Sequence, residues 1–293
     1  MQIVLLGTVE FSQRMLDKLL EMGTPIAGIV TASAGRNHSD FADLTKRASQ
    51  KGIPLIRVDD ANDSATLSWL TALEPDYVFC FGWSQLLRAE FLSIPRRGTI
   101  GYHPAALPKN RGRHPIIWAI VLGLKETAST FFMVNEGVDS GPIISQEKVA
   151  ISAREDAASL YEKLVTVAER QLEQFIPLLA KNTLSLVEQD IDESSSWRKR
   201  SERDGEIDWR MAGSTIDRIV RGLAKPYVGA HFLYEGQPIK LWRCSVEAEA
   251  ARNAEPGKIL EIKSDRILVK AGVGAVWLDH VEPEIFPEKG TYL

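Results

Sequence analysis

The chain has few cysteines, and this excludes two kinds of site. Only Cys80 and Cys244 occur among the 293 residues, far apart and without a CxxC pair. A disulfide framework or a thiolate zinc site needs more cysteines at closer spacing. Cys80 lies in the apolar run at 77–81, where a cysteine usually serves as a small core residue. We therefore expect a protein of a reducing compartment, and a cytoplasmic one.

Long hydrophobic runs and an excess of positive charge are also absent. No apolar stretch approaches the roughly 20 residues that cross a bilayer, and the first residues lack the basic start of a signal peptide. The chain has 39 acidic and 35 basic residues, a net charge of −4 at pH 7. A broad electrostatic interaction with nucleic acid is therefore not expected. The 44% hydrophobic and 25% charged content is typical of a globular protein.

Glycine-rich phosphate loops are missing as well. The turn GTVEFS at 7–12 follows an apolar run and precedes a helical pattern, but it is neither GxGxxG nor a P-loop. A plain strand–helix turn is one interpretation; the other is that Glu10 and Ser12 touch a substrate at this sheet edge. His38 and His114 have no HxH or HExxH spacing, so no metal site is predicted.

The first half of the chain alternates between strand-like and helix-like segments. Because its strands are apolar and β-branched, the alternation predicts a Rossmann-like, doubly wound, mostly parallel sheet with helices on both faces. Ligands of such α/β folds bind at the carboxyl ends of the strands. The expected strands are 2–6, 25–30, 55–58, 77–81 and 98–101, and the expected helices are 11–22, 41–51, 65–73 and 159–179.

The pattern changes after residue 193. Residues 194–205 are polar and Ser-rich, which suits a linker. A helix is expected at 212–223, followed by five short strands at 231–234, 239–242, 258–262, 266–270 and 275–278. We therefore predict a catalytic domain at 1–193, a linker at 194–205 and a small OB-like β-barrel domain at 206–293.

Two Gly/Pro-rich runs carry the candidate chemistry. GYHPAALPKNRGRHPIIW at 101–118 puts His103 on a turn after a strand, and NEGVDSGPII at 135–144 supplies Asp139. A histidine and a carboxylate fixed in separate turns suit general acid–base chemistry in a cleft. A core histidine and a turn-capping aspartate are the alternative interpretations.

These runs resemble the formyltransferases that use 10-formyltetrahydrofolate. The similarity extends to LLGTVEF at 5–11, RKRSERDGEIDW at 198–209 and RGLAKPYVGA at 221–230, and so covers nearly the whole chain. Glycinamide ribonucleotide transformylases resemble only the first domain and carry a Gly-rich phosphate turn. Methionyl-tRNA formyltransferases have a longer basic insertion where this chain has the short, charge-balanced segment 34–44. Sugar-nucleotide N-formyltransferases, which act on 4-amino-4-deoxy sugars, are more similar, with RGR at 111–113 and a PYxGA segment followed by a strand with Trp242.

The resemblance implies a role for each matching residue. His103 would handle protons and stabilise the oxyanion, and Asp139 would orient the imidazole. 10-Formyltetrahydrofolate is the implied co-substrate, and a homodimer is the expected assembly. The cofactor-binding candidates are Trp83, Ser84, Leu86, Leu87, Val134 and Asp139. The substrate-binding candidates are Glu10, Ser12, Tyr102, Lys109, Asn110, Arg111 and Arg113. Core packing for Leu86 and a solvated basic loop for the cations are the alternatives.

One position departs from the family pattern. An asparagine normally stands two residues before the histidine and donates a hydrogen bond to the formyl oxygen, but this chain has Gly101. Losing one such donor typically costs about a hundredfold or more in rate. Tyr102, Asn110 or a bound water are the candidate replacements.

Three hypotheses follow for function. The first is a sugar-nucleotide N-formyltransferase for surface polysaccharide synthesis, the second is methionyl-tRNA formylation, and the third, motivated by Gly101, is a non-catalytic binder of folate or nucleotide sugar. The residues do not distinguish the sugar, the nucleotide or the amino position.

Overall fold

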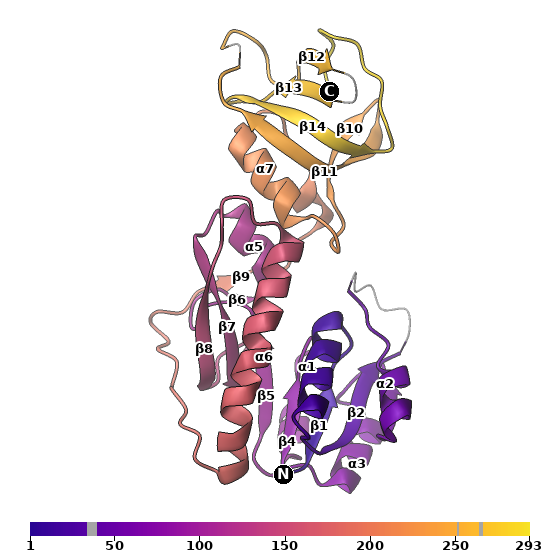
Figure 1. Ribbon diagram of the computed structural model, residues 1–293, viewed down its shortest axis with the longest axis vertical. Helices are drawn as coiled ribbons and strands as arrows, with labels where there is room; N and C mark the ends of the chain where they lie inside the picture. Colours follow the sequence, from indigo (N-terminus) through magenta and orange to yellow (C-terminus); the bar gives the residue numbers. More distant parts are fainter. Residues whose placement is uncertain (34–39, 251, 264–265) are drawn as a thin grey trace. The chain divides into compact units, whose positions relative to one another are not determined.

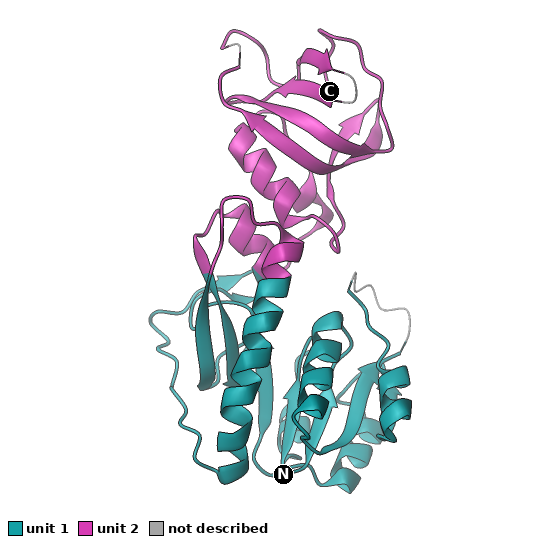
Figure 2. Ribbon diagram, in the orientation of Figure 1, with its two compact units in different colours: residues 1–115, 127–149, 162–197 teal, residues 116–126, 150–161, 198–293 magenta. Residues whose placement is uncertain are grey.

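The computed structural model describes residues 1–33, 40–250, 252–263 and 266–293, and it divides into two compact units (Figure 2). Unit 1 comprises residues 1–115, 127–149 and 162–197; unit 2 comprises 116–126, 150–161 and 198–293. The chain therefore enters unit 2 three times, and the last entry falls inside the segment expected to be a linker. No helix among the residues described is long and apolar enough to span a membrane.

Unit 1 is built on a seven-stranded sheet with the order β3-β2-β1-β4-β5-β7-β8 (Figure 1). The first five strands of this order pair in parallel, and β7 runs antiparallel to β5. The mostly parallel sheet is confirmed, while β7 and β8 are additions that the sequence analysis did not identify. The bounds are β1 (Ile3–Leu6), β2 (Ile26–Ala32), β3 (Leu55–Val58), β4 (Tyr77–Cys80), β5 (Thr99–His103), β7 (Glu126–Met133) and β8 (Ile143–Ala150).

Helices accompany these strands as the hydrophobic periodicity predicted. The apolar stripe of α1 is buried, with Phe11, Met15 and Leu16 each at most 6% exposed. The second helix begins at Thr45 rather than at 41, because the Asp43 carboxylate accepts the Thr45 amide hydrogen and fixes the turn before it. The bounds are α1 (Glu10–Glu21), α2 (Thr45–Lys51), α3 (Ser64–Leu73), α4 (Ala89–Leu92), α5 (Pro115–Val121) and α6 (Ala157–Lys181).

The two faces of this sheet have different cores. One face carries an aromatic cluster in which Tyr102 stacks on Phe11 with ring centroids 4.1 Å apart, and Phe131 meets both Tyr102 and Phe175 at 5.0 Å. The other face is mainly aliphatic and includes Val4, Leu6, Val30, Val78 and Phe91. Because strand side chains alternate, Tyr102 faces the aromatic side while Gly101 and His103 face the other.

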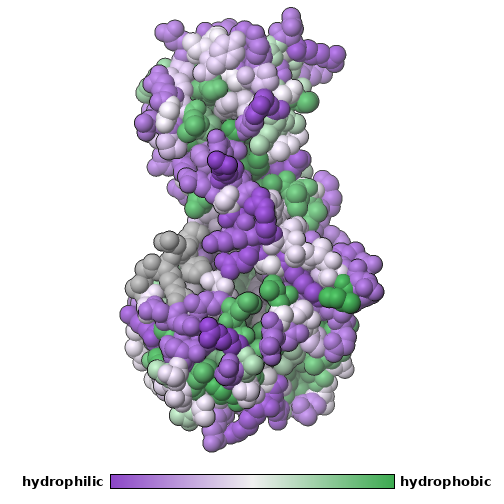
Figure 3. Space-filling view, turned by 180° about the vertical axis from the view of Figure 1, so that it is seen from behind, coloured by the Kyte–Doolittle hydropathy of each residue, from purple (hydrophilic) through white to green (hydrophobic). Residues whose placement is uncertain are grey.

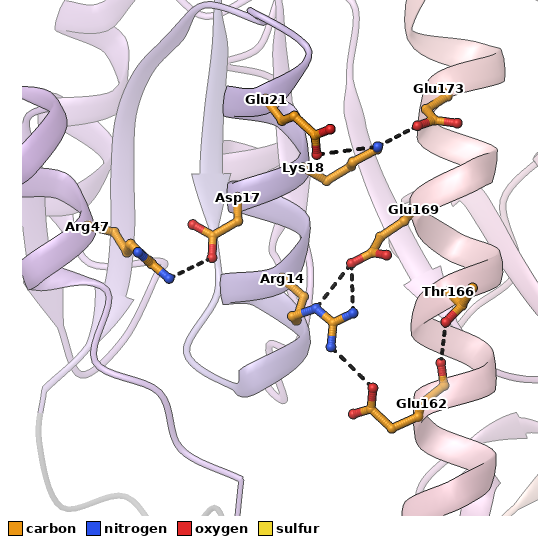
Figure 4. Close-up of polar contacts among 9 residues, drawn as sticks. All are labelled: Arg14, Asp17, Lys18, Glu21, Arg47, Glu162, Thr166, Glu169 and Glu173. Atoms are coloured by element: carbon orange, nitrogen blue, oxygen red, sulfur yellow. Dashed lines mark hydrogen bonds and ion pairs between the residues drawn. The ribbon is translucent and has the colours of Figure 1, made fainter.

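Ion pairs join α1 to α6 (Figure 4). Arg14 reaches Glu162 at 3.2 Å and Glu169 at 3.0 Å, and Lys18 pairs with Glu173 one turn further along. These groups are partly exposed, so the pairs add little to stability. Their effect is mainly to fix how α6 lies along α1 over the aromatic core.

Unit 2 contains a five-stranded antiparallel sheet with the order β10-β11-β14-β13-β12, as expected from the five short apolar runs. Its core combines Trp209, Ile219 and Phe232 with Ile117, which comes from the first entry of the chain into this unit. The bounds are α7 (Gly213–Gly222), β10 (Ala230–Tyr234), β11 (Gln237–Glu247), β12 (Ile259–Lys263), β13 (Arg266–Lys270) and β14 (Ala275–Glu282).

The polar segment 194–205 is more ordered than its composition suggested. It contains β9 (Ser196–Trp197), which pairs with β6 (Arg111–Gly112), and a 3₁₀ turn, η1 (Glu202–Gly205). Arg198 and Arg200 each lie 5.2 Å from the centre of the Trp118 ring, and the Trp118 Nε1 donates to the Arg198 carbonyl. On the face shown in Figure 3, hydrophilic and hydrophobic residues alternate in small groups over both units.

Candidate active site

His103 ends β5 and is 5% exposed. Its Nε2 lies 2.8 Å from the Asn110 carbonyl, and because a carbonyl only accepts, Nε2 carries the hydrogen. Its Nδ1 lies 3.6 Å from Asp139 Oδ2, longer than a hydrogen bond but close enough for charge interaction. The structure thus brings the two predicted residues together and leaves Nδ1 as the nitrogen open to proton exchange.

Asp139 sits in a turn that holds its carboxylate in one direction. Its φ of 48° lies in the left-handed region, which aspartate tolerates better than most residues. Its Oδ2 accepts from the Gly112 amide at 2.9 Å. The Asn135 Oδ1 accepts from the Gly137 amide and from Ser140 Oγ, which folds the loop before it. The Gly112 amide therefore holds the carboxylate, and the Asn135 side chain holds the loop that carries it.

The segment 110–114 that faces Asp139 is also tightly bent. Asn110, Gly112 and His114 all have positive φ, of 64°, 100° and 56°. A Cβ on Gly112 would lie 2.4 Å from the Trp197 carbonyl oxygen, so only glycine fits where β6 meets β9. This bend aims the Gly112 amide at Asp139 and the Asn110 carbonyl at His103.

The space that a side chain at position 101 would need is already filled. A Cβ on Gly101 would lie 2.9 Å from both Phe132 Cζ and Val134 Cγ2. Phe132 pairs with Gly101 across β5 and β7, so its ring covers the glycine. Phe132 and Val134 thus occupy the space that the side chain of a hydrogen-bond donor at position 101 would need.

The Tyr102 side chain lies on the opposite face of β5 from that of His103, which corrects its assignment as a donor or substrate contact. Its ring packs in the aromatic core, where burial raises the pKa of its hydroxyl, and that hydroxyl accepts from Ser129 Oγ at 3.1 Å. Of Tyr102 and Asn110, the two candidate replacements for the missing donor, only Asn110 therefore remains. The Asn110 backbone carbonyl is in contact with the His103 imidazole.

Of the two candidate substrate contacts in the turn after β1, Ser12 has a structural role instead. Ser12 is fully buried, accepts from the Thr8 and Val9 amides and donates to the Phe81 carbonyl. It therefore joins the carboxyl ends of β1 and β4 and cannot reach a substrate, contrary to the expectation. Glu10 is exposed at the start of α1 and stays available.

The three candidate cations have different surroundings. Arg111 is only 8% exposed and donates from Nε and Nη2 to Gln189 Oε1 at 3.2 and 2.7 Å. It is turned inward, which corrects its assignment as a substrate anchor. Arg113 is half-buried and donates to the Ser84 carbonyl at 2.9 Å, while the exposed Lys109 pairs with Glu193 at 2.8 Å.

Two loops offer apolar surface for a flat ligand. Leu86 is 63% exposed on the loop after β4, and Val138 is 49% exposed beside Asp139. Both loops are attached to residues 112–113, through Ser84 and Asp139. Exposed apolar side chains next to backbone polar groups suit a heteroaromatic ring. Leu87 belongs to the core instead, and Trp83 packs partly against it.

Gln189 lies beside Asp139, although no sequence pattern predicts it there. Its Nε2 donates to the carbonyls of Asp139 and Gly141 at 2.9 and 2.7 Å. The residue stands in a polar segment without regular structure, among exposed acids, and no motif or periodicity marks it. Its proximity to the site arises from tertiary folding alone.

Cys80 lies close enough to Asp139 to feel its charge. Burial raises the pKa of the Cys80 thiol to about 12, and the negative charge of Asp139 adds to the effect. The thiol is therefore protonated at neutral pH and unsuited to act as a nucleophile. Within the described ranges, no group of three or more His, Cys, Asp or Glu residues could hold a metal; His38 lies outside them.

Comparisons with known proteins show the family to which the chain belongs. The chain matches the formyl transferase family profile over residues 1–176 and the formyl transferase C-terminal domain profile over residues 199–285. Methionyl-tRNA formyltransferases from Alkaliphilus oremlandii and Caldanaerobacter subterraneus are 30% and 31% identical, over 96% and 97% of this chain and 92% and 93% of theirs. Among solved structures, the sugar 3N-formyltransferase WlaRD, determined with dTDP and 5-N-formyl-THF, superposes with a TM-score of 0.71 at 15% identity, over 97% of this chain and 99% of that one.

Proposed function

Because the chain belongs to the formyl transferase family and is a formyltransferase, we propose that its acceptor is the amine of a nucleotide-linked 4-amino-4-deoxy sugar. The formyl donor in this proposal is 10-formyltetrahydrofolate, and the product is a formamido sugar for surface polysaccharide. The charge of the surface beside the site is the observation that carries the choice of acceptor.

That surface is acidic. The segment 188–193 exposes Glu188, Asp190, Asp192 and Glu193. It is attached next to the site, because the Ser195 carbonyl accepts the Arg111 amide and Glu193 pairs with Lys109. A polyanion such as tRNA would be repelled here. A nucleotide sugar carries only two phosphates, and Arg113 and Lys109, the latter already paired with Glu193, are the cations proposed to bind them.

The residues also fit the formyl donor. 10-Formyltetrahydrofolate supplies an activated formyl carbon when bound, and the exposed Leu86 and Val138, with the half-buried Trp83, would hold its ring system. Backbone groups of the same loops would pair with the polar edge of the ring.

Proton handling falls to His103 and Asp139. When the neutral amine forms its C–N bond with the formyl carbon, it must lose a proton, and Nδ1 is the open nitrogen that can accept it. The Asp139 carboxylate balances the resulting imidazolium. The proton is then available to the nitrogen that departs as the old C–N bond breaks.

Negative charge on the formyl oxygen needs a donor, and Asn110 is the proposed one. Its carboxamide belongs to the residue whose carbonyl touches the imidazole. Asn110→Ala should lower turnover by about a hundredfold while folate binding, measured by fluorescence quenching, changes little. Asn110→Asp is the matched variant, because it removes the amide donor without changing the size of the side chain. Undiminished turnover in both variants would show that Asn110 is not the donor to the formyl oxygen.

A mass-spectrometric screen tests the acceptor. The protein is mixed with 10-formyltetrahydrofolate and UDP-, dTDP- and GDP-linked 3- and 4-amino sugars, with initiator methionyl-tRNA alongside. One formylated 4-amino sugar is the expected result. His103→Ala should abolish at least about 99% of that product, since a general acid–base residue contributes about 10²–10⁴-fold.

Methionyl-tRNA formylation is the second candidate, favoured by the two relatives that are 30% and 31% identical along the whole chain. Formylated tRNA without any formylated sugar would make it the function. Folate binding without product from any acceptor would instead leave a non-catalytic binder.

A further inference from the structure

An inward-facing glutamine lies within a mostly exposed segment beside the site. Between Lys181 and Trp197 the half-buried residues are Leu184, Gln189 and Ser194, and the others are exposed. The segment is fixed at both ends, by a two-way backbone pair between Val187 and Ile143 and by the bond from the Arg111 amide to the Ser195 carbonyl. Gln189 lies between these two attachments.

The Gln189 carboxamide uses its full hydrogen-bonding capacity on two loops. Both hydrogens of Nε2 go to carbonyls of the carboxylate turn, Asp139 O and Gly141 O. Its Oε1 accepts twice from the buried guanidinium of Arg111. An amide has two donors and two acceptor positions, so none remains for a ligand. The arrangement is that of a connector rather than of a binding group.

The turn that Gln189 holds is a strained one. Asp139 has a left-handed φ, and such residues persist only where the surroundings over-determine them. Gln189 fixes the carbonyls on both sides of Ser140, and through Arg111 it ties them to the strand whose Gly112 amide binds Asp139 Oδ2. Without this link, the carboxylate would keep its hydrogen bond to the Gly112 amide and the turn its contacts with Asn135, but the carbonyls of Asp139 and Gly141 would lose their side-chain donor.

The same segment also supports the histidine. Ser195 Oγ accepts the Asn110 amide at 3.0 Å, and the Asn110 carbonyl accepts from His103 Nε2. Residues 187–196 therefore hold the partners of both imidazole nitrogens.

We infer that Gln189 is a positioning residue for formyl transfer: it keeps the Asp139 carboxylate oriented at His103 by fixing the 139–141 turn to Arg111. The inference rests on the proposed roles of His103 and Asp139. It assigns a part in the reaction to a residue that touches neither substrate.

Three variants separate positioning from bulk stability. Gln189→Leu removes every polar contact. Gln189→Glu keeps an acceptor for Arg111 but replaces the two donors by a carboxylate that faces two carbonyls. Gln171→Leu is the matched control, since Gln171 is a buried glutamine of α6 that donates to Ser129 O and Ser145 Oγ on β7 and β8.

The readouts are kcat and KM for the acceptor found in the screen, the pH profile of kcat, and the ¹⁵N signals of the His103 ring. Both Gln189 variants should lose about 10–100-fold in kcat with KM for the acceptor changed less than about threefold, and the profile and ring signals should move. Gln171→Leu should lower thermal stability and leave kcat, the profile and the ring signals unchanged.

Two results would overturn the inference. Wild-type kcat in Gln189→Glu would show that holding Arg111 is sufficient, and unchanged ring signals in Gln189→Leu would show that His103 does not depend on this link. The ring signals need no turnover, so the inference can fail while the proposed function stands. Conversely, formylated tRNA without any formylated sugar would remove the proposed function, and full activity of His103→Ala would remove the proposed role of His103, in both cases without any Gln189 variant.

Discussion

At the scale of single residues, Gly101 is the main difference between this site and the family pattern. Strand β5 presents a glycine where a family member would carry a donor side chain, and Phe132 and Val134 occupy the space. The sequence predicted the deficit but not the packing, because contacts between β5 and the 132–134 segment depend on the pairing of two strands. Restoring the family residue would therefore disturb the core before it added a donor.

Substituting Gly101 should destabilise the protein. Gly101→Ala would bring a methyl group within 2.9 Å of two side chains, and such overpacking costs about 1–3 kcal/mol. Urea denaturation measures the loss, and Phe132→Leu in the same chain should recover part of it. Gly101→Asn should lower turnover rather than raise it. An increase would mean that the site accepts the family donor after all.

Both thiols should be inert in the folded protein. Burial raises the pKa of Cys80 to about 12 and raises that of Cys244 as well. At pH 8.5, iodoacetamide should therefore label neither residue within an hour, and should label both after denaturation, as read by mass spectrometry. Because the thiol of the unfolded chain ionises near pH 9, the contribution of Cys80 to stability is complete below that pH and is lost as pH rises towards about 12. Rapid labelling of the folded protein would contradict the burial.

At the scale of elements, periodic segments were predictable and pairing-dependent ones were not. The stripe of α1 and the run at 77–81 gave the helix and the strand within a residue or so, since each pattern is complete in itself. Strand β9 has two residues and exists only through its pairing with β6. The candidate site divides in the same way: the turns that carry His103 and Asp139 were recognisable in the sequence, and the structure brings these two residues within 3.6 Å, whereas the place of Gln189 depends on the tertiary fold.

The segment 198–205 should depend on one carboxylate. Arg198 hydrogen-bonds Asp204 and holds the pKa of that carboxyl well below its usual range, with help from Ser201. Asp204→Asn should therefore raise amide hydrogen exchange in 198–205 with little change in the thermal midpoint. In the wild type, the contribution is present above the ordinary carboxyl value of 3.8 and fades as pH falls below it. Unchanged exchange in the variant would assign the order of this segment to Trp118 instead.

At the scale of the whole molecule, the two units do not follow the simple division that composition suggested. The change in sequence composition after residue 193 lies close to the last border between the two units, at residues 197/198. The earlier passages at 116–126 and 150–161 are not distinguished by composition, because the first is largely apolar and the second mixes apolar and charged residues, as segments of unit 1 also do. Only the contacts of Ile117 with the core of unit 2 reveal where the first of them belongs.

A chain ending at Trp197 should consequently fold poorly. It would keep Ile117 and Val121 without the side chains of unit 2 that cover them. Lower soluble yield and a broad thermal transition, measured by scanning calorimetry against the full chain, are the expected results. A sharp, reversible transition for residues 1–197 would show that Ile117 and Val121 are buried by other residues of the shorter chain.

Because unit 2 is formed from three separate segments of the chain, its first segment is synthesised well before the last one. When the ribosome has made residues 116–126, the segment 198–293 that completes their core does not yet exist. At about 5–20 residues per second, making residues 127–197 alone takes roughly 4–14 s. During that interval the apolar side chains of α5 lack their partners from 198–293, which makes this helix a suitable segment for binding by a ribosome-associated chaperone.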